Sequence, residues 1–269
     1  MTKVAIFQGP EQAGEVAYQL DRLAQAAQAS AVQGANLLIL PEMFLSGYNI
    51  GPPAVQRLAE PADGPAAQQI AQIARETGVA VLYGYPERAE NAVFNAAQLI
   101  DSSGRRLANH RKSHLFGSID RNAFSAGTAS TVVELDGLRL GILICYDVEF
   151  PENVRLLALA GVDFVAVPTA LMQPYGFITR TLVPARAYEN QVFLAYANRC
   201  GQEQELRYLG QSCIIAPDGR ELARAGRGEA LIVAELDHSL QQQSRQINTY
   251  LADRRPALYQ PLTTSGDAQ

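Results

Sequence analysis

Leu37-Leu38-Ile39-Leu40-Pro41-Glu42 places a carboxylate directly after a short, wholly apolar run. A run of this length without polar alternation is typical of a strand that is covered on both faces. Residues 4–7 form a second such run, and residues 12–33 between the two carry apolar side chains at helical spacing. The sequence therefore predicts a strand-helix-strand unit, with Glu42 just beyond its second strand.

The same alternation continues along the chain. Further helices are predicted at residues 65–76 (ending at Gly78), 151–160 and 181–190, each followed by a strand, at 79–83, 164–167 and 192–197. Turn residues predict hairpins over residues 91–112, 131–145 and 212–225, and a last strand covers 230–236. We therefore expect an α/β fold whose sheets contain both parallel and antiparallel strands.

The composition limits the class of protein. With 269 residues, 48% of them apolar, the chain has enough material for one large domain. We place that domain at residues 1–237, and the more polar residues 238–269 are predicted to form an arm that suits a dimer interface. The net charge of −5 and the scattered Lys and Arg residues argue against a nucleic-acid partner. The N-terminal apolar run is too short for a signal peptide and no segment has membrane-spanning length, so we expect a cytoplasmic protein without a membrane partner.

The cysteines and histidines do not form a metal site in the sequence. Three cysteines make an odd count without a Cys-x-x-Cys spacing, which argues against a disulfide framework or a zinc site. His110 and His114 lie four residues apart but lack a third ligand nearby. We therefore expect neither a metal ion nor another cofactor.

Three reactive side chains share one structural position. Glu42, Lys112 and Cys145 each come at or just after the end of a predicted apolar strand. The carboxyl ends of strands in α/β sheets open onto ligand crevices, so we expect the three to converge although they are far apart in sequence.

These residue types together suit attack on an amide. A thiol with an ordinary pKa near 8.5 needs a base, which Glu42 provides, and the ammonium of Lys112 with the backbone N–H of Tyr146 would stabilise the oxyanion. Taken singly, each residue type more often has no catalytic role: a cysteine here is usually part of the core, and a glutamate or a lysine is usually a solvated surface residue. A papain-like arrangement, with His110 or His114 as the base, is the alternative.

Three blocks of sequence resemble, in order, the signature blocks of the nitrilase superfamily of carbon-nitrogen hydrolases. They are Leu40-Pro41-Glu42-Met43-Phe44, His110-Arg111-Lys112-Ser113-His114-Leu115-Phe116, and Ile144-Cys145-Tyr146-Asp147 with Phe150-Pro151-Glu152. The resemblance implies a four-layer α-β-β-α sandwich, with two mixed sheets between helical layers, that forms homodimers or larger homo-oligomers. It also implies the Glu42, Lys112 and Cys145 triad and the oxyanion role of Tyr146.

Within the superfamily the chain resembles the 5-aminopentanamidase-like aliphatic amidases of bacteria. The resemblance lies in residues 46–51, 83–88, 167–170 and 189–191, and in Cys145-Tyr146-Asp147, where true nitrilases typically have Cys-Trp-Glu. It implies hydrolysis of a small linear carboxamide through a thioester. An N-carbamoyl amine hydrolase is the nearest alternative. The residues expected to bind substrate are Tyr48, Asn49, Ser118, Glu149, Thr169, Met172 and Tyr175.

One position departs from the family pattern. Relatives usually have a second glutamate six residues after the lysine, where this chain has Ser118. A serine cannot carry a negative charge or act as a base near neutral pH, which puts turnover in doubt. Three explanations follow. The activity of the protein could be altered, in the extreme case to that of a weakened relative that binds amides without cleaving them. A neighbour such as Asp120 or Glu149 could compensate, or the serine could be a deliberate inactivating substitution.

Overall fold

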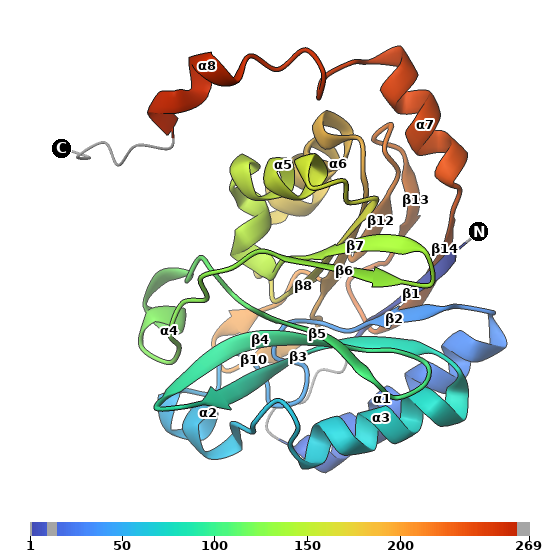
Figure 1. Ribbon diagram of the computed structural model, residues 1–269. Helices are drawn as coiled ribbons and strands as arrows, with labels where there is room; N and C mark the ends of the chain where they lie inside the picture. Colours follow the sequence, from blue (N-terminus) through green and yellow to red (C-terminus); the bar gives the residue numbers. More distant parts are fainter. Residues whose placement is uncertain (1, 10–14, 263–269) are drawn as a thin grey trace.

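The computed structural model describes residues 2–9 and 15–262. Two mixed sheets face each other, and helices cover their outer faces (Figure 1). The strand orders are β14-β1-β2-β3-β4-β5 and β13-β12-β9-β8-β7-β6. The predicted four-layer α-β-β-α sandwich is thus confirmed.

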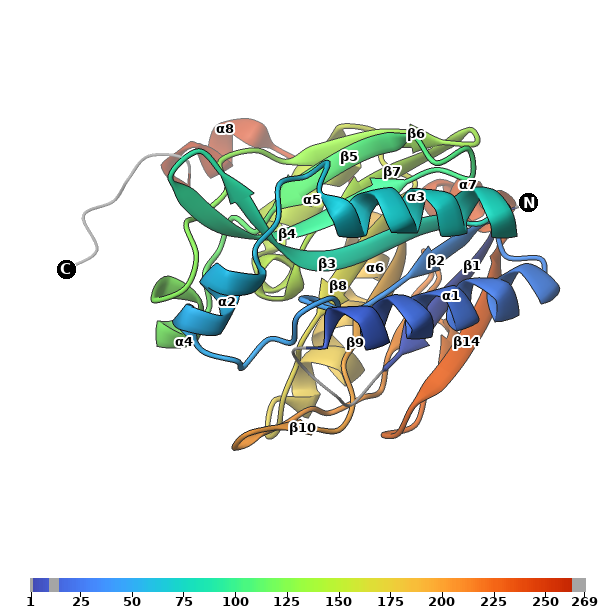
Figure 2. The same ribbon diagram turned by 90° about the horizontal axis from the view of Figure 1, so that it is seen from below.

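The first half of the chain builds most of the first sheet. Its elements are β1 (Thr2–Gln8), α1 (Val16–Val32), β2 (Leu37–Ile39), α2 (Pro52–Leu58), α3 (Pro65–Thr77), β3 (Ala80–Ala89), β4 (Ala92–Ile100) and β5 (Arg106–Arg111). Strands β1, β2 and β3 pair in parallel, whereas β4 and β5 continue the sheet antiparallel. Helices α1 and α3 lie side by side on its outer face (Figure 2).

The second half builds the second sheet. Its elements are α4 (Gly117–Arg121), β6 (Thr131–Leu135), β7 (Leu138–Ile142), η1 (Cys145–Glu149), α5 (Pro151–Leu159), β8 (Phe164–Thr169), η2 (Ile178–Leu182), α6 (Val183–Asn190), β9 (Phe193–Asn198), β10 (Gln202–Glu203), β11 (Leu206–Arg207), β12 (Cys213–Ile215) and β13 (Glu221–Arg224). Strand β14 (Ala230–Leu236) then returns to the first sheet and pairs antiparallel with β1. Helices α5 and α6 pack on the outer face of the second sheet.

The alternation of side chains along β2 explains the unbroken apolar run. Leu37 and Ile39 join the core between the two sheets, together with Phe164 of the opposite sheet. Leu38 points the other way and packs in the layer under α1 and α3. Since both faces of this strand are covered, every residue of β2 is buried.

Several segments differ from the sequence prediction, among them α2 and the C-terminal arm. Helix α2 was not predicted, because its short segment begins with Pro52 and Pro53 next to a turn-rich loop. The polar arm begins as a regular helix, α7 (His238–Ile247), where the carboxylate of Asp237 accepts the N–H of Ser239 at 2.9 Å. Residues 12–14 of the first predicted helix lie outside the described residues.

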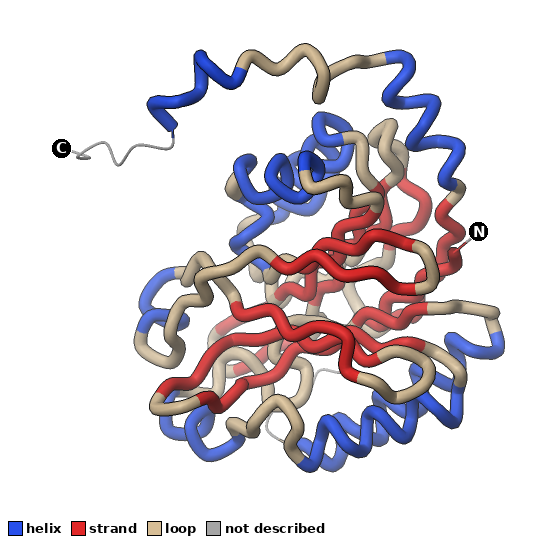
Figure 3. The backbone as a smooth tube through the Cα atoms, viewed as in Figure 1, coloured by secondary structure: helices blue, strands red, loops and turns tan. Residues whose placement is uncertain are grey.

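The arm runs along the helical side of the second sheet before it leaves the body of the protein. Gln241 and Ser244 of α7 are buried, and the side chain of Gln191 donates to the carbonyls of Ser244 and Asn248, both at 2.7 Å. The arm continues to α8 (Pro256–Tyr259) and η3 (Gln260–Leu262), which are set apart from the two sheets (Figure 3). Over the described residues, every helix is too short or too polar to cross a membrane.

Gly84 in β3 allows the backbone that carries Glu42 to lie directly on the strand. A Cβ atom at this position would stand 2.4 Å from the Met43 nitrogen and 2.8 Å from the Glu42 Cα. Gly84→Ala is therefore expected to lower the free energy of unfolding by about 3 kcal/mol, as measured by urea unfolding. Gly226→Ala is the matched control, because a Cβ there meets nothing within 4 Å. Equal stability of the two variants would contradict this prediction.

Candidate active site

Glu42 and Lys112 meet in the interior although 70 positions separate them. The Nζ atom of Lys112 lies 2.7 Å from Oε1 of Glu42, and both side chains are fully buried. Lys112 follows β5 directly, and its N–H donates to the Asn95 carbonyl of β4 at 2.8 Å. The pairing of β5 with β4 thus places Lys112 next to the Glu42 carboxylate.

The two oxygens of Glu42 have different surroundings. Oε1 accepts hydrogen bonds from Lys112 and from the amide of Asn95, the latter at 2.7 Å. Oε2 is buried and has no hydrogen-bond partner among the described residues. One oxygen is thus held in place, and the other is available to accept a proton.

A second carboxylate contacts Lys112. Oδ2 of Asp120 in α4 lies 2.7 Å from the Lys112 ammonium and accepts the N–H of Phe116 at 2.8 Å. Asp120 is fully buried, whereas Ser118 is exposed. Of the three explanations for Ser118, this contact supports compensation by Asp120.

Cys145 is the first residue of η1, the short segment that connects β7 to α5. Strand β7 ends at Ile142, three residues earlier than predicted, and Cys145 adopts a left-handed backbone with φ 47°. For a residue other than glycine, this conformation is uncommon and requires support from its surroundings. The thiol is largely buried, and the nearby Thr169 side chain and Ala170 backbone act to lower its pKa.

Burial and mutual charge set the protonation states of the three groups. Burial, and next the charge of Glu42, raise the pKa of the Cys145 thiol, so the thiol keeps its proton at neutral pH. Burial would lower the pKa of Lys112, but the neighbouring acidic groups, Glu42 first, hold it well above its usual value. Burial also raises the pKa of Glu42, and Lys112 partly offsets this. The site thus combines a protonated thiol, an ammonium and a carboxyl group whose proton affinity is increased.

A pocket of about 470 Å³ opens beside this cluster. Its wall includes five of the predicted substrate-binding residues: Tyr48, Asn49, Ser118, Met172 and Tyr175. The Tyr48 ring joins the pocket to the cluster, because its centroid lies 5.7 Å from the Lys112 ammonium. Two other predicted residues do not line it: Thr169 contacts the thiol instead, and Glu149 is half-buried, with its pKa raised by burial.

A buried ion pair that the sequence analysis missed holds the loop after Glu42. Arg199 donates to the carbonyls of Glu42 and Met43 at 3.3 and 3.1 Å and pairs with Glu203. Glu203 in turn accepts the backbone N–H groups of Tyr48 and Asn49. The sequence gives no signal for this role, because the partners on the loop are about 155 positions away.

Neither histidine of the papain-like alternative is placed as a partner for the thiol. The rings of His110 and His114 both approach Asp147, at 3.5 and 2.8 Å. The charged groups that act on Cys145 are instead Glu42 and Lys112. Within the described part of the chain, no group of three His, Cys, Asp or Glu residues is arranged to hold a metal ion.

Comparisons with known proteins give the class to which this fold and site belong. Residues 3–246 match the carbon-nitrogen hydrolase family. The chain is 56% identical to "Hydrolase in pqqF 5'region" of Pseudomonas protegens, over 97% of this chain and 92% of that protein. It is 39% identical to an (R)-stereoselective amidase of Pseudomonas sp, over 94% and 91% of the two chains.

Solved structures agree with the sequence comparisons. A mutant amidase from Nesterenkonia sp. AN1 superposes with a TM-score of 0.84 at 32% identity and covers 97% of each chain. In that structure, acrylamide has added to the active-site cysteine. The protein belongs to the carbon-nitrogen hydrolase family, within the nitrilase superfamily.

Proposed function

We propose that the protein hydrolyses a small linear carboxamide, such as 5-aminopentanamide, to a carboxylate and ammonia through a thioester on Cys145. The observation that carries this proposal is the Lys112 ammonium, bound between the Glu42 and Asp120 carboxylates beside a buried thiol. Relatives that are amidases, one with a modified active-site cysteine, support the same chemistry.

In the first step, Oε2 of Glu42 takes the thiol proton as Sγ attacks the amide carbonyl. The carbonyl oxygen becomes an oxyanion, which the Lys112 ammonium and the N–H of Tyr146 stabilise. Collapse of this intermediate breaks the C–N bond, and the Glu42 proton moves to the nitrogen, which leaves as ammonia. The acyl group stays on sulfur.

In the second step, Glu42 removes a proton from a water molecule that attacks the thioester. The C–S bond breaks, the thiol regains its proton and the carboxylic acid leaves. Asp120 also pairs with Lys112, so the ammonium stays charged and fixed throughout both steps. In this proposal, Asp120 takes the place of the glutamate that Ser118 replaces.

The pocket favours an uncharged or amine-bearing chain. Of the residues that line it, Glu205 alone is charged, and Asn49 donates to its carboxylate at 3.2 Å. A carboxylate on the substrate chain would be repelled by Glu205, whereas an ammonium would be attracted. Apolar contacts for a short methylene chain come from Val55, Phe116, Met172 and Leu206.

The test compares amides of equal length. Ammonia release should be fastest with 5-aminopentanamide, slower with pentanamide and slowest with the amide that ends in a carboxylate. Release of carbon dioxide from an N-carbamoyl amine, at a higher kcat/KM than any of the amides, would favour the alternative hydrolase.

Ser118→Glu should change kcat by no more than a few-fold. Activity that arises only after this substitution would show that the natural chain is a weakened relative.

The pH dependence of kcat/KM should report the pKa of Glu42. The base must be deprotonated, so activity should fall as the pH drops through this pKa, which burial places above the ordinary value of 4.5. Asn95→Ala should move the acid limb to higher pH, because the Asn95 hydrogen bond lowers the pKa of Glu42. An acid limb at or below pH 4.5, or a shift to lower pH in the variant, would contradict the base assignment.

We also propose a cytoplasmic homodimer that uses the outer face of α5 and the C-terminal arm of residues 238–269. Leu156 and Leu159 of α5 are exposed, and with Arg254 and Tyr259 of the arm they line a pocket of about 440 Å³. An apolar surface of this kind favours a protein partner. Light scattering on the purified chain would give its molar mass, and a monomer at micromolar concentration would contradict the dimer.

A further inference from the structure

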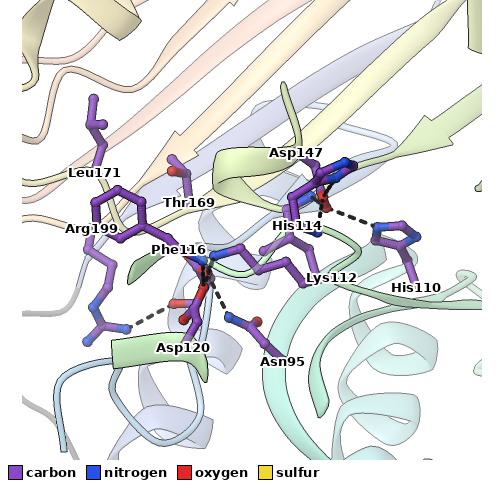
Figure 4. A network of polar contacts seen from close by, with 12 residues as sticks. Asn95, His110, Lys112, His114, Phe116, Asp120, Asp147, Thr169, Leu171 and Arg199 are labelled. Atoms are coloured by element: carbon purple, nitrogen blue, oxygen red, sulfur yellow. Dashed lines mark hydrogen bonds and ion pairs between the residues drawn. The ribbon is translucent and has the colours of Figure 1, made fainter. Parts of the chain in front are cut away.

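Asp147 collects hydrogen bonds from two separate segments. Its Oδ1 accepts the backbone N–H of His114 at 2.8 Å and lies 2.8 Å from the ring Nδ1 of the same residue. Its Oδ2 accepts the N–H of Ile144 at 3.1 Å and lies 3.5 Å from Nε2 of His110. The carboxylate is fully buried, and Figure 4 shows both rings directed toward it.

The residues that contact Asp147 surround the proposed catalytic groups. His110 and His114 lie two positions before and after Lys112, while Asp147 itself lies two positions after Cys145. Lys112 follows β5 of the first sheet, whereas Cys145 follows β7 of the second. One carboxylate therefore ties together the ends of two strands from opposite sheets.

We propose that Asp147 is a positioning residue that fixes the Lys112 ammonium relative to the Cys145 thiol. This inference rests on the proposed function. Stabilisation of an oxyanion by Lys112 depends on this geometry, because a misplacement of about 1 Å can reduce a rate about 100-fold. The bond to the Ile144 N–H also supports the left-handed backbone at Cys145.

The position requires a carboxylate in particular. Each Asp147 oxygen faces a backbone N–H donor, one from Ile144 and one from His114. An asparagine would turn an NH₂ group toward one of these donors and leave that contact without an acceptor. Burial would raise the pKa of Asp147, but hydrogen bonds from His110 and His114 lower it well below its usual range, so the group stays ionised.

Asp147→Asn tests the proposal against a matched control, Asp101→Asn. Asp101 also accepts several hydrogen bonds, from Ser103 and Arg105, but it lies in the turn between β4 and β5. At temperatures well below the Tm of each variant, Asp147→Asn should lower kcat about 100-fold and change KM less than threefold. The rate at which iodoacetamide alkylates Cys145 should also change. Asp101→Asn should lower only the Tm.

A purely stabilising role would give the opposite pattern. A folded Asp147→Asn protein with kcat within threefold of the natural chain, or a kcat loss matched by Asp101→Asn at an equal fall in Tm, would overturn the proposal. If Asp147→Asn does not fold, His114→Ala keeps the backbone bond to Asp147 and removes the ring, together with its contacts to Asn153 and Phe150. This variant should lower kcat about tenfold, and an unchanged kcat would overturn the proposal. Failure of the proposed function itself would differ, because the natural chain would then release no ammonia.

Discussion

Cys145→Ala should abolish ammonia release, with a fall in kcat of at least about 10⁴-fold. The reason is that no other group can form the thioester: the remaining contacts still bind the amide, but Glu42 has no thiol to deprotonate. The measurement is ammonia release under saturating amide, together with the mass of the protein after rapid quenching. The natural chain should gain the mass of the acyl group, and the variant should not.

Cys213→Ala provides the control for this experiment. Cys213 is also a free, buried cysteine, and burial raises the pKa of its thiol to about 11, but it lies in β12 and contacts Thr179. Its replacement should leave kcat unchanged. Ammonia release that survives Cys145→Ala, or an acyl adduct that maps to Cys213, would remove the proposed mechanism.

Lys112→Met should have the largest effect on stability. It removes the cation that pairs with the carboxylates of both Glu42 and Asp120 and leaves these two carboxylates in the interior. Breaking a buried ion pair in this way costs about 3–5 kcal/mol, and the loss of oxyanion stabilisation should lower kcat by about 10²–10³-fold. Urea unfolding and ammonia release measure the two effects.

The loss of stability in Lys112→Met should depend on pH. Burial raises the pKa of Glu42, and without the ammonium nothing from Lys112 offsets this, so the protonated form of Glu42 is favoured in the folded protein. The variant should therefore recover stability as the pH falls below this raised pKa. Arg220→Met is the control, since the side chains of Arg220 and its partner Asp218 are 63% and 34% exposed, and its loss should cost only about 1 kcal/mol or less. A stability deficit that does not change with pH would contradict this account.

Three of the groups in the site could be predicted because each follows a predicted strand. The sequence marks Glu42 and Cys145 by their place after apolar runs and Lys112 by its place after β5, which is only partly buried, and the family resemblance joined them into one site. Asp120 was only one of several candidates to compensate for Ser118. Its position in a five-residue helix after β5 carries no periodic signal, and only its distance to Lys112 singles it out.

The supporting residues had no signal in the sequence. Asn95 lies within β4, where its side chain was indistinguishable from that of any polar strand residue. Arg199 and Glu203 follow β9 and resemble an ordinary local ion pair, yet they hold a loop from the other half of the chain. Asp147 reads as part of the Cys-Tyr-Asp motif, and its contacts with both histidines arise only when the sheets face each other.

The sequence by itself determined the local elements and the chemical types in the site. Apolar runs and turn residues act over a few positions, so most strands, the longer helices of the two layers and the reactive residues at strand ends followed from them, whereas α2, α4 and α7 did not. The tertiary structure alone decided which carboxylates contact Lys112, which oxygen of Glu42 stays free and how Asp147 joins the two sheets. These contacts depend on close packing between segments that are far apart in the chain, and the local sequence pattern does not encode the distances between such segments.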